Sequence, residues 1–336
     1  MFAQLVLRRL ISVIFVLIGL SIITFTLSHI VPADPARLIA GPRASKSTVQ
    51  MIRHEYGLDR PLYDQYFTYV KGVTTLDFGT SLSTLRPVRS DLGRYLPATV
   101  ELALTSIVLA IVAGIPLGII SAIRPNTIID YLGRVISVCG QAIPVFWLAL
   151  MLQFLFFAKL GWLPDGQRLP VSVTPPRSIT HLYTVDALLT GNFSLFLTAA
   201  KHLILPAFVL AFGTLPVITR MVRAGMLEVL GLDYIRTARA KGLRERTTVT
   251  KHALKNALLP VVTVIGMQIG ILFSGDILVE IIFSWPGIGR YAIAGVTSFD
   301  YNAIMAVTLI IGFIYVIMNM FVDILYLFLD PRISYV

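Results

Sequence analysis

Cysteine is almost absent from this chain of 336 residues, in which Cys139 stands alone inside an apolar run. A single cysteine permits neither an intrachain disulfide nor a cluster of cysteine ligands around a metal. Histidine is also sparse, and none of the five histidines belongs to an H-E-x-x-H motif: His29, His54, His181, His202 and His252. We therefore expect no metal site.

Charge is scarce as well. Charged residues make up 14% of the chain and hydrophobic residues 56%, with a mean hydropathy of +0.80. This balance excludes a water-soluble domain and predicts an all-α polytopic membrane protein in a lipid bilayer. The net charge of +10 lies in loops without interleaved stacking aromatics, so we attribute it to membrane topology and lipid headgroups and expect no nucleic acid partner.

The chain also lacks nucleotide-binding and catalytic motifs. No G-x-x-x-x-G-K-[ST] sequence occurs, so the chain does not hydrolyse a nucleotide by the P-loop route. We expect no catalytic residues and no cofactor in this chain, and any ATP-derived energy must come from another chain.

What the sequence does contain is a series of long apolar runs, each able to cross a hydrocarbon core of about 30 Å. We predict six transmembrane helices, at about 9–30, 99–123, 133–158, 203–222, 256–281 and 301–326. Pro116 and Pro144 interrupt two of them and predict bends. The apolar patch from Ala187 to Leu197 is too short to span, and we place it at the outer interface. Gly266 and Gly270 form a G-x-x-x-G that permits close helix approach, although chance explains it equally well.

Charge in the flanking segments predicts the orientation. Arg8 and Arg9 precede the first run without a following cleavage site, so we expect a retained span with a cytoplasmic N-terminus. The segment 31–97 carries nine Lys/Arg against six Asp/Glu, but it exceeds the length over which loop charge reports orientation, and we place it outside. It contains two expected helices, one capped by the box Ser47-Thr-Val-Gln50 and one opened by Pro61. The predicted organisation is an N-terminal part (1–96), a permease core (97–329) with a cytoplasmic loop (223–255), and a cytoplasmic tail (330–336).

The most informative stretch is the basic segment from Arg220 to Pro260. Nine of its residues are basic: Arg220, Arg223, Arg236, Arg239, Lys241, Arg244, Arg246, Lys251 and Lys255. We expect Asp233 to cap a short helix that Gly242 ends in a left-handed conformation. Ala238 and Ala240 give this helix little side-chain bulk, so we expect it to insert into a groove of another protein, with Ala238 facing that partner.

The stretch Asp233-Tyr-Ile-Arg-Thr-Ala-Arg-Ala-Lys-Gly242, followed by His252-Ala-Leu-Lys-Asn-Ala-Leu-Leu-Pro260, resembles the cytoplasmic signature of ABC importer permeases. Phe283-Ser-Trp-Pro-Gly-Ile-Gly-Arg290 and Asp330-Pro-Arg-Ile333 are similar to the dipeptide/oligopeptide subgroup. The resemblance covers essentially the whole chain. It implies the type I importer permease fold in a bacterial inner membrane.

The resemblance also implies the partners. They are a homologous second permease, two cytoplasmic ATPase subunits that bind ATP and magnesium, and an extracytoplasmic solute-binding protein that delivers a dipeptide or short oligopeptide. Related permeases carry glutathione, nickel or oligosaccharides, so the cargo stays open. The residues assigned to coupling with the ATPase are Asp233, Tyr234, Arg236, Thr237, Ala238, Arg239, Ala240, Lys241, Gly242 and Pro260.

Carboxylates at the ends of the predicted spans raise two other function classes. A membrane-embedded protease needs paired carboxylates at depth, whereas Asp276 and Asp323 fall at opposite ends of their predicted helices. An ion-coupled secondary carrier needs carboxylates near mid-span, and none occurs there. We instead expect Asp276 and Glu280 to serve as caps or ion-pair partners at an outer gate, together with Trp285, Pro286 and Gly287.

Overall fold

The computed structural model describes residues 2–30, 35–41, 43–55 and 57–329. Helices dominate this part of the chain, and within it the only β pairing is an isolated antiparallel bridge between Thr80 and Pro87. The all-α prediction is therefore confirmed for the described residues. The tail 330–336, including the Asp330-Pro-Arg-Ile333 motif, lies outside them.

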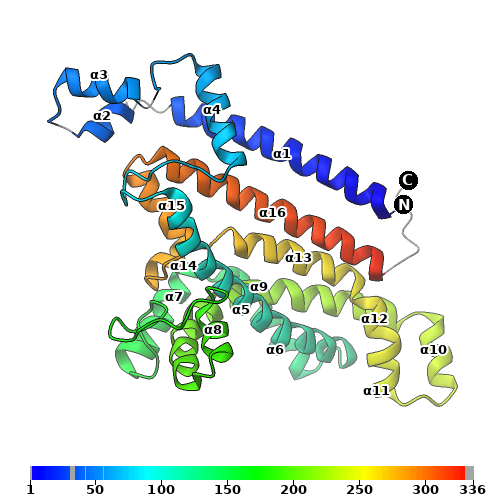
Figure 1. The fold of residues 1–336 in the computed structure, drawn as a ribbon. Coiled ribbons are helices and arrows are strands. Elements are labelled where there is room, and N and C mark those ends of the chain that lie inside the picture. The colour runs from blue at the N-terminus through cyan, green and yellow to red at the C-terminus, as the bar shows by residue number, and fades with distance from the viewer. Residues whose placement is uncertain (1, 31–34, 42, 56, 330–336) are drawn as a thin grey trace. The chain divides into compact units, whose positions relative to one another are not determined.

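Contacts divide the chain into two units. Figure 1 shows the helices coloured along the chain. Unit 1 comprises residues 1–99 and 286–314, and unit 2 comprises residues 100–285 and 315–336. Helices α5 and α16 each have residues in both units.

Unit 1 contains the N-terminal helix, the helices of the predicted outer segment, and the beginnings of α5 and α16. Its elements are α1 (Phe2–Ile30), α2 (Pro35–Ala40), α3 (Lys46–Glu55), α4 (Leu62–Thr74), the start of α5 (Val88–Ile123), α15 (Ile288–Thr297) and the start of α16 (Tyr301–Leu329). Its core joins α5, α15 and α16 through Val88, Leu92, Ile288, Tyr291, Ala303, Ala306 and Val307. The expected cap of α3 is wrong by two positions, because the Ser45 hydroxyl, not that of Ser47, accepts from the amide of Thr48 at 3.2 Å.

Unit 2 is built around one long helix. That helix, α9 (Phe193–Leu230), contacts α6, α7, α8, α12, α13 and α14. The other elements are α6 (Ile128–Ala142), α7 (Val145–Gln153), η1 (Phe154–Lys159), α8 (Tyr183–Leu189), α10 (Asp233–Ala240), α11 (Glu245–Thr247), η2 (Thr248–Ala253), α12 (Leu254–Ala257), α13 (Leu259–Phe273) and α14 (Ile277–Ile282).

Three helices in the described residues are long and apolar enough to cross a membrane: 88–123, 193–230 and 301–322. Two bent pairs raise this number to five if each pair is one span. The shorter apolar stretch Ile11–Leu27 lies within α1.

The structure changes several predicted boundaries. The run 133–158 is not one straight helix, because α6 and the following helix meet at an angle of 102°. Ile143 takes an extended conformation there, as the residue before a proline does when Pro144 clashes with a helical backbone. The run 256–281 is likewise divided: α13 ends at Phe273 and α14 begins at Ile277.

Helix α9 extends beyond the predicted span 203–222 at both ends. It starts at Phe193, so the apolar patch that we placed at the interface belongs partly to the same helix. Asn192 caps it by accepting from the amide of Leu195 at 3.0 Å. Its last turns, to Leu230, occupy the beginning of the predicted loop 223–255.

The G-x-x-x-G motif does mediate close helix approach. A Cβ atom added at Gly266 would collide with Val322 of α16, and one at Gly270 would lie 3.0 Å from the ring of Tyr315. Small residues here let α13 and α16 pack backbone to side chain.

Candidate functional site

Helix α10 carries most of the residues assigned to coupling, and it rests on its own chain. Ile235 is fully buried and Ala238 is 8% exposed, and the helix contacts η2, where Val249 and Ala253 are buried. The expectation that Ala238 faces a partner is therefore wrong. A helix with one apolar side must bury that side, and α10 buries its apolar side within its own chain, where it contacts η2.

The start of α10 differs from the prediction, whereas its end matches it. Leu232, with an extended backbone, holds the N-cap position, and Asp233 is the first helical residue, so the predicted Asp233 cap is wrong by one position. Gly242 adopts φ +75°, as predicted. The amides of Gly242 and Leu243 donate to the carbonyls of Arg239 (2.9 Å) and Ala238 (3.3 Å), a Schellman ending that favours glycine.

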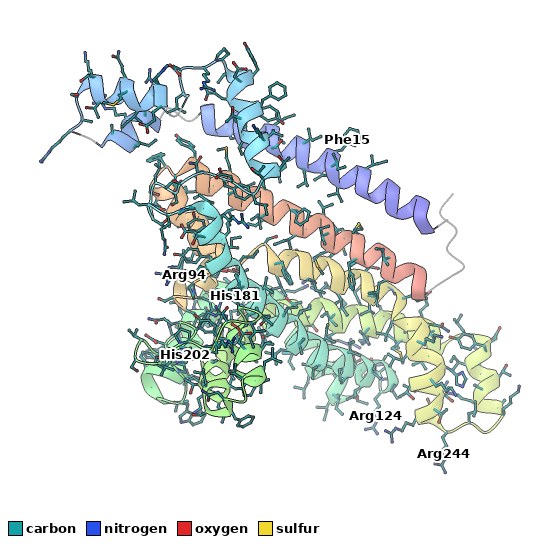
Figure 2. All side chains as sticks on the ribbon, viewed as in Figure 1. Phe15, Arg94, Arg124, His181, His202 and Arg244 are labelled. Atoms are coloured by element: carbon teal, nitrogen blue, oxygen red, sulfur yellow. The ribbon has the colours of Figure 1, made fainter. Side chains whose placement is uncertain are left out.

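The outer side of α10 remains open to solvent. Arg236, Thr237, Ala240 and Lys241 are exposed there, and Ala240 is the small residue among them. Arg239 forms an exposed ion pair with Glu245 at 2.7 Å, and Arg244 extends from the following turn (Figure 2). Tyr234 accepts a hydrogen bond from Asn256 at 2.8 Å, which ties α10 to α12. The exposed side of α10 is thus a surface with one small residue and basic neighbours, and the contacts of α10 with η2 and α12 fix its position.

Pro260 lies in the first turn of α13, where proline fits because no helical hydrogen bond is lost. The preceding helical segment meets α13 at 57°. Pro260 thus marks the point at which the chain turns from the basic segment into an apolar helix.

An ion cluster that the sequence did not single out joins α6 to α9. The buried carboxylate of Asp130 accepts from Arg223 at 2.8 and 3.1 Å and from Arg134 at 2.5 Å. The amide of Asn126 also donates to it, at 3.0 Å. The i, i+4 spacing of Asp130 and Arg134 was a visible signal, but Arg223 lies 93 residues away and only the fold brings it near. Because Arg223 stands on α9 shortly before α10, the cluster fixes the start of the basic segment.

The residues assigned to an outer gate belong to different units. Asp276 caps α14 by accepting from the amide of Val279 at 3.0 Å, which confirms its expected capping role. Glu280 and Trp285 are buried in unit 2, and the amide of Trp285 donates to the carbonyl of Glu280 at 2.8 Å. Pro286 opens the unit 1 segment, and Gly287 is the N-cap of α15.

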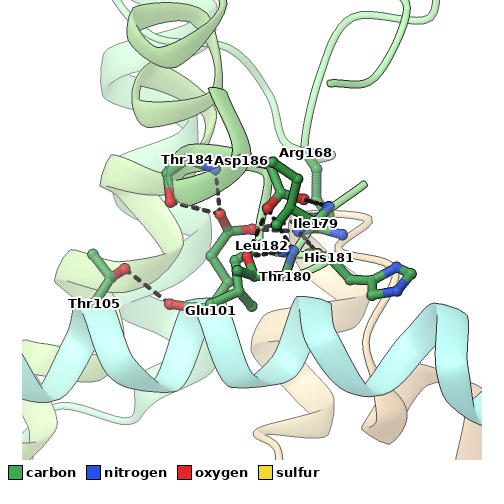
Figure 3. Close-up of polar contacts among 9 residues, drawn as sticks. All are labelled: Glu101, Thr105, Arg168, Ile179, Thr180, His181, Leu182, Thr184 and Asp186. Atoms are coloured by element: carbon green, nitrogen blue, oxygen red, sulfur yellow. Dashed lines mark hydrogen bonds and ion pairs between the residues drawn. The ribbon is translucent and has the colours of Figure 1, made fainter. Parts of the chain in front are cut away.

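A second buried ion pair lies where the segment 159–192 meets α5 (Figure 3). Arg168 donates to Glu101 at 2.6 Å, and the two side chains are 6% and 3% exposed. The amide and hydroxyl of Thr184 both donate to the other Glu101 oxygen at 2.7 Å, and the Arg168 guanidinium stacks 3.5 Å from the ring centre of Tyr183.

Next to this pair, Asp186 organises the turn before α8 (Figure 3). Its carboxylate accepts from the amide and hydroxyl of Thr180, both at 2.7 Å, and from the amide of Ile179. Burial raises the pKa of this carboxyl, but these hydrogen bonds together outweigh burial and lower it. The segment 159–192 is thus an ordered structure held by buried polar contacts.

Apolar helices of membrane-spanning length, packed around α9 and joined to a folded basic segment, indicate an integral membrane protein. Residues 1–103 match the N-terminal part of the binding-protein-dependent transport system membrane components, and residues 114–335 match the inner membrane component itself. The chain belongs to this family of inner membrane permeases.

Individual relatives match along nearly their full length. The probable D,D-dipeptide transport system permease protein DdpB of Escherichia coli K12 is 45% identical over 97% of this chain and 96% of its own. The dipeptide transport system permease protein DppB of Alkalihalophilus pseudofirmus is 45% identical over 98% of both chains. The glutathione transport system permease protein GsiC of Escherichia coli K12 is 38% identical over 98% of both.

Among solved structures, a chain of the inward-facing MetNI methionine ABC transporter superposes with a TM-score of 0.52 and 19% identity. The match covers 71% of this chain and 96% of that one. At this identity the likeness shows the fold alone, which is the type I ABC permease fold.

Proposed function

We propose that this protein is a translocation subunit of an ATP-driven importer of dipeptides or short oligopeptides. The observation that carries this proposal is the 45% identity, over almost the whole chain, to permeases named for D,D-dipeptide and dipeptide transport. Glutathione, itself a short peptide, is the alternative cargo, because the glutathione permease GsiC is 38% identical over the same length.

The chain works with partners in this proposal. A second permease completes the pathway, an extracytoplasmic binding protein delivers the peptide, and two cytoplasmic ATPase subunits bind ATP and magnesium. The exposed side of α10, around Ala240, docks in the ATPase, while Ile235 and Ala238 hold α10 on η2. Motion of the ATPases then reaches the membrane helices through η2, α12 and the turn at Pro260.

The expected activity separates this proposal from an enzyme or a stand-alone carrier. The purified chain alone should show no ATP hydrolysis, because it has no P-loop. Assembled in liposomes with ATPase, second permease and binding-protein candidates from the same genome, it should hydrolyse ATP and take up labelled dipeptide, faster when the binding protein is loaded. Hydrolysis by the isolated chain, or ion-driven uptake without the partners, would contradict the proposal. Competition between dipeptide and glutathione for the binding protein decides the cargo.

The proposed topology has six spans, both termini in the cytoplasm and the segment 31–97 outside. In a Cys139→Ser background, Ser47→Cys should react with a membrane-impermeant thiol reagent added outside, and Lys251→Cys should react only after the membrane is opened. Both positions are exposed. Thr248 is buried, so a cysteine there would fail to react on either side of the membrane and would not report the topology. The reversed labelling pattern would invert the topology.

A further inference from the structure

Helix α4 in unit 1 touches α1 well inside the apolar part of that helix. The hydroxyls of Tyr66 and Ser21 lie 2.9 Å apart, and those of Tyr69 and Thr24 lie 3.4 Å apart. Ser21 donates its own proton to the carbonyl of Ile18 at 2.8 Å, so Tyr66 must be the donor to Ser21. The Phe25 ring also packs against both tyrosines, at 5.3 and 5.9 Å between ring centres.

These contacts fix the depth of α4 relative to α1. Ser21 and Thr24 lie within the apolar stretch Ile11–Leu27. At a rise of about 1.5 Å per residue, Ser21 is roughly 13 Å and Thr24 roughly 9 Å from the end of α1 at Ile30. If α1 is the first span, as the proposed function requires, Tyr66 and Tyr69 reach below the level at which the hydrocarbon core begins.

The remaining surface of α4 is divided between apolar and polar sides. At about 100° per residue, Tyr63 and Phe67 lie on one side of the tyrosines that contact α1, and Thr68 and Gly72 lie on the other. Tyr63 is 64% and Phe67 is 68% exposed in the chain. Gln65, Thr68 and Gly72 instead line a cavity of about 610 Å³ in unit 1.

The neighbouring helix α3 has a different character. Its four ionisable residues are Lys46, Arg53, His54 and Glu55, and its one large exposed apolar residue is Met51. The formally charged residues of helix α4 are only Asp64 and Lys71, which lie between its apolar and polar sides. Helix α1 leaves large apolar side chains uncovered as well, among them Phe15 (Figure 2) and Ile23. Like the uncovered apolar side chains of α1, the uncovered aromatic side of α4 is therefore suited to contact with lipid.

We propose that α4 is an interfacial membrane helix, with Tyr63 and Phe67 inserted in the outer leaflet of the bilayer and Gln65, Thr68 and Gly72 facing a water-filled cavity. Aromatic side chains at the headgroup level are the usual anchors at such an interface. The segment 31–97 is then partly membrane-bound, and α4 anchors its outer part to the first span.

The test uses the full chain in lipid nanodiscs, in a Cys139→Ser background, with a single environment-sensitive fluorophore on Phe67→Cys, Thr68→Cys, Ile23→Cys or Ser47→Cys. Thr68 is the matched control, because it is adjacent to Phe67, is also exposed and lies on the polar side. Labels at Phe67 and Ile23 should be quenched several-fold more by lipids spin-labelled near the headgroup than labels at Thr68 and Ser47. Aqueous iodide should give the reverse order.

Equal lipid and iodide quenching at Phe67 and Thr68, with Ile23 still lipid-quenched, would overturn the interfacial helix and leave the first span intact. Strong iodide quenching at Ile23 would show that α1 is exposed to water and is not the first span, which would overturn the proposal. Shielding of Phe67 from iodide only after a binding protein is added would mean that this side docks protein, which also overturns the proposal. Tyr63→Cys replaces Phe67→Cys if the latter fails to accumulate.

Discussion

Unit 2 holds its charges in two contrasting ways. In the segment 159–192 and α5, Glu101 and Arg168 are buried, and the two Glu101 oxygens accept hydrogen bonds from Arg168 and Thr184. Around α10, Arg239 and Glu245 pair while remaining exposed, and Arg236 lies 3.4 Å from an almost fully exposed Asp233. Buried pairs fix a structure because losing one partner leaves an uncompensated charge, whereas exposed pairs exchange partners at little cost. The first region is therefore built to hold one arrangement, and the second is free to meet another protein.

The largest effect is expected from breaking the buried pair. Arg168→Ala should destabilise the protein by about 3–5 kcal/mol, because Glu101 would be left buried without its cation. Thermal unfolding in detergent and membrane abundance measure this loss. Arg177→Ala, an exposed arginine of the same segment, serves as the control and should be close to neutral. Similar stability of the two variants would show that Glu101 and Arg168 contribute no more than a surface pair.

An intermediate effect is expected on the exposed side of α10. Ala240→Glu should leave abundance unchanged but reduce ATPase co-purification roughly tenfold, or about 1.4 kcal/mol, since a larger charged group enters a docking contact. Ala238→Glu should lower abundance itself, because Ala238 is buried against its own chain. Normal uptake by Ala240→Glu at normal abundance would exclude this side of α10 as the docking surface.

The smallest effect belongs to the exposed pair. Arg239→Gln should change stability by less than about 1 kcal/mol, and the difference should shrink as salt is raised, because both side chains are largely in solvent. A double-mutant cycle with Glu245→Gln measures the coupling at low and high salt. A large coupling that persists in high salt would place this pair in the same class as Glu101 and Arg168.

Part of the fold follows directly from the sequence. Long uncharged runs predict helices because an apolar helix is the simplest structure that satisfies its backbone in lipid. Helices α1, α5, α9 and α16 each contain a predicted run, and α13 lies within the predicted run 256–281. The left-handed ending at Gly242 was also predictable, because the Schellman geometry depends on the local chain and on a residue without a Cβ.

Helix direction and length were less predictable. Pro144 signals a bend, but the 102° angle depends on how α6 and α7 each pack against α9. The tolerance of proline in α9 also depends on tertiary packing. Helix α9 continues through Pro206 and Pro216 because neighbouring helices cover it, and local helix propensity does not predict this.

By itself, the sequence determined the membrane class, the lack of a P-loop motif and the position of the basic segment, because composition and short motifs are local properties. Tertiary structure alone decided which side of α10 is free, since only the fold places η2 beneath Ala238. The same holds for Arg223 beside Asp130 and for Glu101 beside Arg168, 93 and 67 residues apart in the chain. A sequence does not show which opposite charges will pair, because a buried ion pair forms only where helix packing removes both groups from water together.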